Sequence, residues 1–239
     1  MKAWRPGLLG AVLLAGSVLS APPALAGTDE DGTRLMRGET VTYDQTIDNE
    51  ERRYVGGVTY TIVDAPLPRL ARIFADVTVY ARILPATKSA RLVAKKGADT
   101  WVELTQGNGV VETSYTLHMR SEADGTTVRF WLDKTRPHGI EDAWGFFRAT
   151  PLEEIGTGPR ALVTYGALLD LGPGLARALF EEKLRRLMLS VPQRLQAYVS
   201  ATAAAARPSP PADVLNLALA EPRTVGLPAS AGAAGAATR

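Results

Sequence analysis

The sequence contains no cysteine. This absence excludes a disulfide, a thiolate nucleophile, a zinc site with thiolate ligands and a lipoprotein anchor. Histidine is nearly as scarce, since only His118 and His138 occur. We interpret His118 as a solvated residue on a polar strand face. We interpret His138 as an ordinary turn residue. The alternative for His138 is that its loop lies at the rim of a cavity and presents it to a ligand. Two histidines so placed argue against a histidine-based metal site, and we expect neither a metal nor a cofactor.

The chain also lacks the common nucleotide-binding and hydrolase motifs. It has no phosphate loop ending in Lys-Ser/Thr, no G-x-G-x-x-G, no G-x-S-x-G and no H-E-x-x-H. An excess of charge is missing as well, because the formal net charge is +2. Removing residues 1–26 leaves 25 basic and 25 acidic residues. Both nucleic-acid binders and basic peripheral membrane proteins need a positive electrostatic field. The balanced charge of this chain therefore argues against both classes, and we expect no nucleic-acid partner.

Residues 1–26 have the pattern of a secretory signal peptide. Two basic residues precede the apolar stretch 8–19, and the sequence Ala-Leu-Ala at 24–26 matches the cleavage rule. The stretch is too short to cross a hydrocarbon core of about 30 Å, which needs about 20 residues. We therefore predict an exported protein, periplasmic or secreted, that begins near Gly27. An uncleaved membrane anchor is the alternative.

The two ends of the remaining chain are unlike its middle. Residues 27–39 are polar and predict a flexible leader, and residues 202–239 are rich in alanine and proline and predict a disordered tail. The segment 40–201 between them is the expected domain. No internal repeat and no second domain is evident in it.

The segment 172–201 predicts one long amphipathic helix. Apolar residues recur there at spacings of three and four, namely Leu175, Leu179, Leu184, Leu187, Met188, Val191, Leu195 and Tyr198. Pro192 lies late in this helix and should kink it, because its ring clashes with the preceding turn. A helix this long and this apolar on one side needs a concave surface to receive it.

The sequence ahead of that helix predicts the surface. A weak peripheral strand is expected at 40–46 and a stronger one at 54–63, followed by two short helices at 68–76 and 77–84. Six further strands are expected at 89–95, 100–106, 110–120, 126–133, 140–151 and 160–171. The breaks between them are short and rich in Gly, Pro, Asn and Asp, which favours antiparallel hairpins over parallel crossovers.

Several short stretches carry a family resemblance. They are Val63-Asp64-Ala65-Pro66, the spaced set Asp76, Tyr80 and Leu84-Pro85, and the helical segments 177–181 and 192–195. With the order of elements, they resemble the START-like superfamily, also called SRPBCC, which includes polyketide cyclases and dehydrases. The resemblance covers about residues 53–199 and implies an α+β helix-grip fold. In that fold a curved antiparallel sheet of about seven strands surrounds a long C-terminal helix, with two short helices after the first strand. It also implies a cavity for an apolar ligand between sheet and helix.

Strand 140–151 carries aromatic and charged residues on one face, namely Asp142, Trp144, Phe146 and Arg148. If this face points inward, its two charges need partners, which could be each other across the cavity or a polar ligand head. If it points outward, Gly145, Phe147 and Ala149 face the core instead. Alternation with a period of two does not choose between these orientations.

The predicted ligand-binding residues combine the inward orientation with the apolar face of the long helix and with inward positions on neighbouring strands. They are Trp101, Glu103, Tyr115, Phe130, Asp142, Trp144, Phe146, Arg148, Leu184, Leu187 and Met188.

Two functions fit these features. The first is an exported, noncatalytic protein that binds a lipid or another apolar small molecule, and the second is an enzyme of cyclase or dehydrase type acting on an apolar substrate. The sequence has no recognisable acid–base constellation, so we favour the binding protein. A filled core serving a protein interaction is a third reading. We expect a monomer, and transient contact with a membrane is left open.

Overall fold

The computed structural model describes residues 29–48, 52–107, 112–152, 158–173 and 175–205, with the backbone alone described for 175–179. The predicted signal peptide and most of the predicted tail lie outside these ranges. The chain divides into two units, Met1–Ser200 and Ala201–Arg239. The fold described below belongs to the first unit, and of the second only the last turn of a helix is described. No helix within the described ranges is long and apolar enough to span a bilayer.

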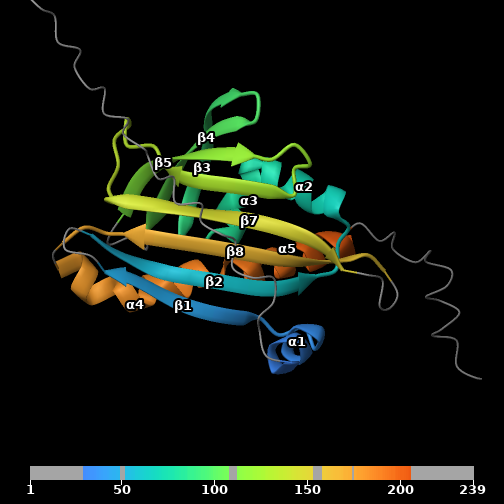
Figure 1. Ribbon diagram of the computed structural model, residues 1–239. Coiled ribbons are helices and arrows are strands. Elements are labelled where there is room, and N and C mark those ends of the chain that lie inside the picture. The colour runs from blue at the N-terminus through green and yellow to red at the C-terminus, as the bar shows by residue number, and fades with distance from the viewer. Residues whose placement is uncertain (1–28, 49–51, 108–111, 153–157, 174, 206–239) are drawn as a thin grey trace, which may run out of the picture. The chain divides into compact units, whose positions relative to one another are not determined.

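An eight-stranded antiparallel sheet forms the body of the first unit (Figure 1). Its strands are β1 (Val41–Asp48), β2 (Arg53–Val63), β3 (Thr87–Lys96), β4 (Asp99–Gly107), β5 (Glu112–Ser121), β6 (Thr127–Leu132), β7 (Asp142–Leu152) and β8 (Arg160–Asp170). The strand order is β1-β2-β8-β7-β6-β5-β4-β3. The six strands predicted after the helix pair are therefore confirmed. The weak strand predicted at 40–46 is a full edge strand, paired with β2 over its whole length, so the sheet has eight strands.

Two short helices connect β2 to β3 at the opposite edge of the sheet. They are α2 (Leu67–Ala75) and α3 (Val77–Ile83), as predicted from the sequence. Asp76 ends α2 and caps α3, because its carboxylate accepts a hydrogen bond from the Thr78 amide at 2.9 Å. Both helices bury their apolar residues in the main core. The pair therefore closes one end of the space beside the sheet.

A further helix, α1 (Asp29–Met36), lies where a flexible leader was predicted. That prediction is wrong for these residues. Leu35 is buried in a small cluster with Val41, Ile62 and Leu162, separate from the main core. Ile62 and Leu162 alternate with core residues along β2 and β8, so α1 covers the other face of the sheet. One buried leucine in a polar segment gave no periodic signal in the sequence.

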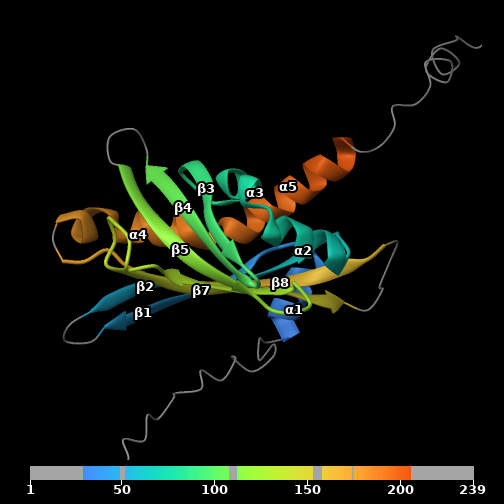
Figure 2. The ribbon, with the colours of Figure 1, turned by 90° about the horizontal axis from the view of Figure 1, so that it is seen from above.

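The predicted C-terminal helix is present and kinked. It consists of α4 (Leu175–Leu189) and α5 (Val191–Ala205), which meet at Ser190. Pro192 occupies the second position of α5, where its missing N–H is not needed. The break leaves carbonyls of α4 without helical partners, and the hydroxyl of Thr59 donates to the Leu189 carbonyl at 3.2 Å. Strands β3, β4 and β5 curl away from β8 and β2, and the two helices lie in the resulting angle (Figure 2).

The two arms of this helix are held differently. In α5, Val191, Leu195 and Val199 are at most 2% exposed and belong to the main core. In the described part of α4, Leu189 alone is fully buried, and Leu184 and Met188 are half-buried. The sheet therefore grips α5 tightly and leaves space beside α4.

Candidate ligand-binding cavity

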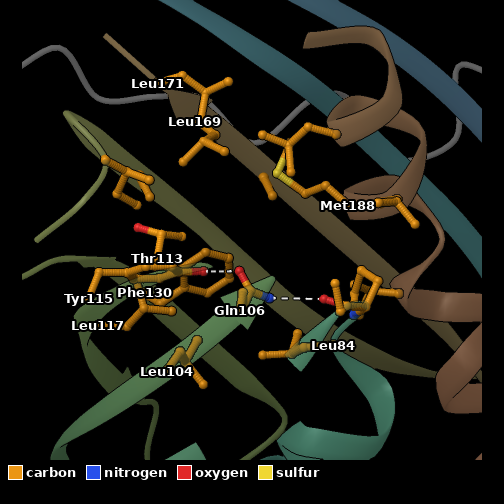
Figure 3. Close-up of a pocket in the computed structure, with 18 of the residues that line it drawn as sticks. Leu84, Leu104, Gln106, Thr113, Tyr115, Leu117, Phe130, Leu169, Leu171 and Met188 are labelled. Atoms are coloured by element: carbon orange, nitrogen blue, oxygen red, sulfur yellow. Dashed lines mark hydrogen bonds between the residues drawn. The ribbon is translucent and has the colours of Figure 1, made fainter. Parts of the chain in front are cut away.

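A cavity of about 320 Å³ occupies the space between α4 and the inner face of the sheet. Its walls come from α3, α4 and strands β4 to β8, and apolar side chains dominate them (Figure 3). They include Leu84, Leu104, Leu117, Phe130, Leu169 and Met188. The volume lies at the lower end of the range of about 300–1,000 Å³ that is typical of small-molecule sites. The cavity can therefore hold one compact apolar molecule.

The cavity explains why α4 is only partly buried. Leu184 and Met188 pack on the core with one side and line the cavity with the other. Leu187 lines the cavity as well. On β2, a Cβ atom at Gly56 would lie 1.9 Å from the Ala167 carbonyl oxygen and 3.0 Å from the Met188 methyl carbon. The missing side chain of Gly56 thus lets the helix and the neighbouring strand approach closely, without a bulge in the pairing of β2 with β8.

One wall of the cavity carries a connected polar group (Figure 3). Tyr115 of β5 donates its hydroxyl hydrogen to the side-chain oxygen of Gln106 on β4. The Gln106 amide nitrogen donates to the Pro85 carbonyl at 3.1 Å and to the Thr87 hydroxyl at 3.0 Å. Tyr115 is half-buried and lines the cavity.

The ionisable groups in the wall are neutral near pH 7, with one exception. Burial raises the pKa of the Tyr80, Tyr115 and Tyr165 phenols above the usual range for tyrosine. Among the described lining residues, Lys183 alone carries a charge, and its side chain is exposed on α4 near Phe180. The interior is therefore apolar, uncharged and supplied with a few hydroxyl groups.

Solved structures resemble this architecture. The fold matches that of the STAR-related lipid transfer protein (fragment 25–204) from Xanthomonas axonopodis with a TM-score of 0.55 and 14% identity, covering 67% of this chain and 93% of that one. The chain has a START-like fold. A START superfamily protein from Mycobacterium smegmatis gives a TM-score of 0.49 at 11% identity, with 61% and 97% of the two chains covered. The Zhui aromatase/cyclase from Streptomyces gives 0.43 at 15%, with 68% and 89% covered.

Sequence comparison adds no relative to this structural match. No family model matches the chain, and no curated protein matches it either. At 14% identity the structural match establishes the fold, and the function has to be argued from the cavity itself.

Five of the predicted ligand-binding residues line the cavity beside α4. They are Tyr115, Phe130, Leu184, Leu187 and Met188. Their common feature is a clear apolar periodicity in the sequence, of period two on β5 and β6 and of three to four on α4. The predicted helix face is thus the one that the structure turns toward the sheet.

Of the two orientations of β7 that the sequence leaves open, the inward one used for the predicted site residues is wrong. Trp144, Phe146 and Arg148 lie on the outer face of the sheet, and Phe147 lies on the inner face with Ala143. Glycines on two neighbouring strands decide the orientation. A Cβ at Gly145 would lie 2.5 Å from the Phe130 ring inside the core, and one at Gly166 would lie 2.6 Å from the Phe146 ring outside. Each phenylalanine thus occupies the room that a glycine leaves across the sheet.

Asp142 and Arg148 are not paired, contrary to one reading of the sequence. The Arg148 guanidinium lies 5.8 Å from the centre of the Phe146 ring on the outer face. Asp142 accepts hydrogen bonds from Lys134 at 2.7 Å, Arg52 at 2.8 Å and the Tyr54 hydroxyl at 2.9 Å. Burial opposes ionisation of Asp142, but the bonds from Lys134 and Tyr54 outweigh it and hold its pKa below the usual value. Asp142 therefore anchors the loop before β7 and does not line the cavity.

Trp101 and Glu103 also lie outside the cavity. Glu103 pairs with Arg91 of β3 at 3.0 Å, where both side chains are exposed. The Trp101 ring stacks on His118 of β5 at 4.3 Å, and His118 contacts Trp131 of β6 at the same distance. His118 also hydrogen-bonds to the Asp99 carboxylate at 2.8 Å. It is an outer-face residue as predicted, but aromatic rings and not water surround much of it.

The polar residues of the cavity are not evident from the sequence. Gln106 is the last residue of the expected strand 100–106, and Tyr165 lies within the apolar run of the expected strand 160–171. Neither has a local signature, because their positions in the cavity depend on how β4, β5 and β8 curl around α4. His138, whose Nδ1 donates to the Ile140 carbonyl at 2.7 Å, is a turn residue as expected and is not among the lining residues.

Proposed function

We propose that this protein is an exported, noncatalytic carrier that binds one apolar small molecule or lipid in the cavity beside α4. The observation that carries the proposal is the mostly apolar pocket of about 320 Å³ between helix and sheet. Tightly packed interiors rarely leave spaces larger than a water molecule, so an apolar pocket of this size between a helix and the sheet that it packs on points to an occupant.

The size of the cavity narrows the class of occupant. A volume at the lower end of the usual range suits a single hydrocarbon chain or a compact ring system. A lipid with two long chains would need considerably more room. The proposed cargo is therefore a single-chain or ring-shaped lipid.

The chemistry of the wall supports binding over catalysis. Among the described lining residues there is neither a carboxylate nor a histidine. The three tyrosines are protonated at neutral pH, as tyrosine ordinarily is, and burial raises their pKa values further from neutrality. General acid–base catalysis works best with a group whose pKa lies near the operating pH, and Lys183 at the surface of α4 is no substitute within the cavity.

The pattern of residues 1–26 supports the proposed export, and we propose that the carrier acts as a monomer. A periplasmic or extracellular carrier needs a binding site that shields an apolar molecule from water, and the cavity meets that need. Exchange of such cargo would involve transient contact with a membrane.

The test is to purify the mature protein from its export compartment, extract it with organic solvent and identify co-purifying molecules by mass spectrometry. We expect one class of apolar molecule at a stoichiometry near one. The matched control is Leu187→Trp, which fills the cavity from α4 and should lower the occupancy while the protein still folds. An empty wild-type protein that also binds no added apolar probe would contradict the proposal.

A further inference from the structure

The orientation of the Gln106 side chain is fixed by its partners. The Pro85 carbonyl can only accept a hydrogen bond, so the Gln106 atom at 3.1 Å from it must be the amide nitrogen. The side-chain oxygen of Gln106 then faces Tyr115. An amide rotated by 180° would place two acceptors against each other at Pro85.

This orientation determines the role of the Tyr115 hydroxyl. A tyrosine hydroxyl has one hydrogen, and Tyr115 gives it to the Gln106 oxygen. A molecule in the cavity can therefore use only the lone pairs of the Tyr115 phenolic oxygen. Tyr115 therefore offers a ligand an acceptor and no donor.

A donor is available elsewhere in the same wall. Tyr165 of β8 is 4% exposed and lines the cavity, and no hydrogen bond joins its hydroxyl to another described residue. The Tyr115 phenol contributes to the raised pKa of Tyr165, after the larger effect of burial, which is consistent with two phenols in one cavity. The Thr113 hydroxyl is likewise buried in the cavity wall without a partner among the described residues. Buried hydroxyls without partners cost stability that a suitable ligand restores.

We propose that the cargo is a neutral apolar alcohol or phenol whose hydroxyl donates to Tyr115 and accepts from Tyr165. The inference rests on the proposed carrier function and specifies the polar end of its ligand. A hydroxyl both donates and accepts, and the two tyrosines supply the complementary pair.

A carboxylate does not fit this wall. It has no hydrogen to give to Tyr115, and its charge would lie in an interior where none of the described lining residues except Lys183 is charged. Lys183 is exposed on α4, so a fatty acid could place its head group only there, at the edge of the cavity. The affinity of an alcohol should therefore depend on Tyr115, whereas the affinity of a fatty acid should depend on Lys183.

The experiment compares three probes with the same ten-carbon chain. They are 1-decanol, decyl methyl ether, which lacks the donor, and decanoate. Binding is measured by displacement of a fluorescent apolar probe from the wild type, Tyr115→Phe and Lys183→Met. We expect 1-decanol to bind the wild type about tenfold more tightly than the ether, as one hydrogen bond allows. Tyr115→Phe should reduce that ratio to less than about twofold, and Lys183→Met should leave it unchanged.

The outcomes separate this inference from the carrier function. If the ether binds the wild type as tightly as the alcohol, the inference is wrong and the carrier function stands. If decanoate binds most tightly and Lys183→Met abolishes that preference, the polar end lies at α4 and the inference is again wrong. If none of the three probes displaces the fluorescent probe, the carrier function itself fails. The comparison within the wild type does not depend on the folding of any variant.

Discussion

Two leucines of the C-terminal helix allow a controlled test of the cavity. Leu195 of α5 is fully buried in the main core. Leu187 of α4 is half-buried and lines the cavity. Truncation of each to alanine removes the same atoms from the same type of element, so a difference in cost reports the packing around them.

The structure sets the expected magnitudes. Leu195→Ala should lower the free energy of unfolding by about 3–5 kcal/mol, because it loses the transfer free energy of the side chain and leaves a void in tight packing. Leu187→Ala should cost about 1–2 kcal/mol, since a side chain facing empty space already lacks contacts on that side.

Urea unfolding followed by circular dichroism measures both values, with and without 1-decanol. At a ligand concentration of about 100 times Kd, binding should stabilise the wild type by about 2.7 kcal/mol. Leu187→Ala should lose part of this increment because Leu187 contacts the cargo, and Leu195→Ala should keep it. Equal costs for the two variants together with no ligand effect would show that the space is a filled core. A Leu187→Ala variant unchanged in both stability and binding would show that this helix face is exposed.

Other parts of the chain give independent predictions. Asp142→Asn should lower stability at pH 7 by about 1 kcal/mol, a modest value for a site near solvent. The folded pKa of Asp142 is depressed, so the stability that its carboxylate contributes is fully present above the unfolded pKa of about 3.9. This stability is lost as the pH falls through the folded pKa. The difference in Tm between the wild type and Asp142→Asn should therefore shrink between pH 7 and pH 3. Deletion of 206–239 should change Tm by less than about 2 °C, since few apolar residues offset its ordering entropy, and a larger drop would show that the segment packs on the domain. N-terminal sequencing of the exported protein should begin near Gly27, and an intact Met1 on membrane-bound material would contradict export.

Much of the fold was predictable because its signals are local. Short turns between β3 and β8 required antiparallel pairing, and the apolar periodicity of 172–201 required a concave partner for a long helix. The kink was predictable from Pro192 alone. What lacked a local signal was missed, as with α1, whose single buried residue Leu35 packs against β2 and β8 from the outer face.

The residues of the cavity were predictable only in part, because their positions also depend on contacts between distant segments. Alternation on β7 allowed two orientations, and Gly145 and Gly166 chose between them through rings on other strands. That choice depends on strand register, which the sequence does not display. The same holds for Gln106 and Tyr165, whose positions in the wall follow from the curl of the sheet around α4.

The most direct test of the carrier function is a titration of the methyl-labelled protein with 1-decanol, followed by NMR. If the cavity beside α4 binds apolar cargo, the methyl signals of Met188, Leu187 and Leu104 should shift and saturate together. The signals of Leu35 and Leu162, in the cluster beneath α1, should stay in place. Shifts confined to that outer cluster, or none at all at saturating alcohol, would contradict the account.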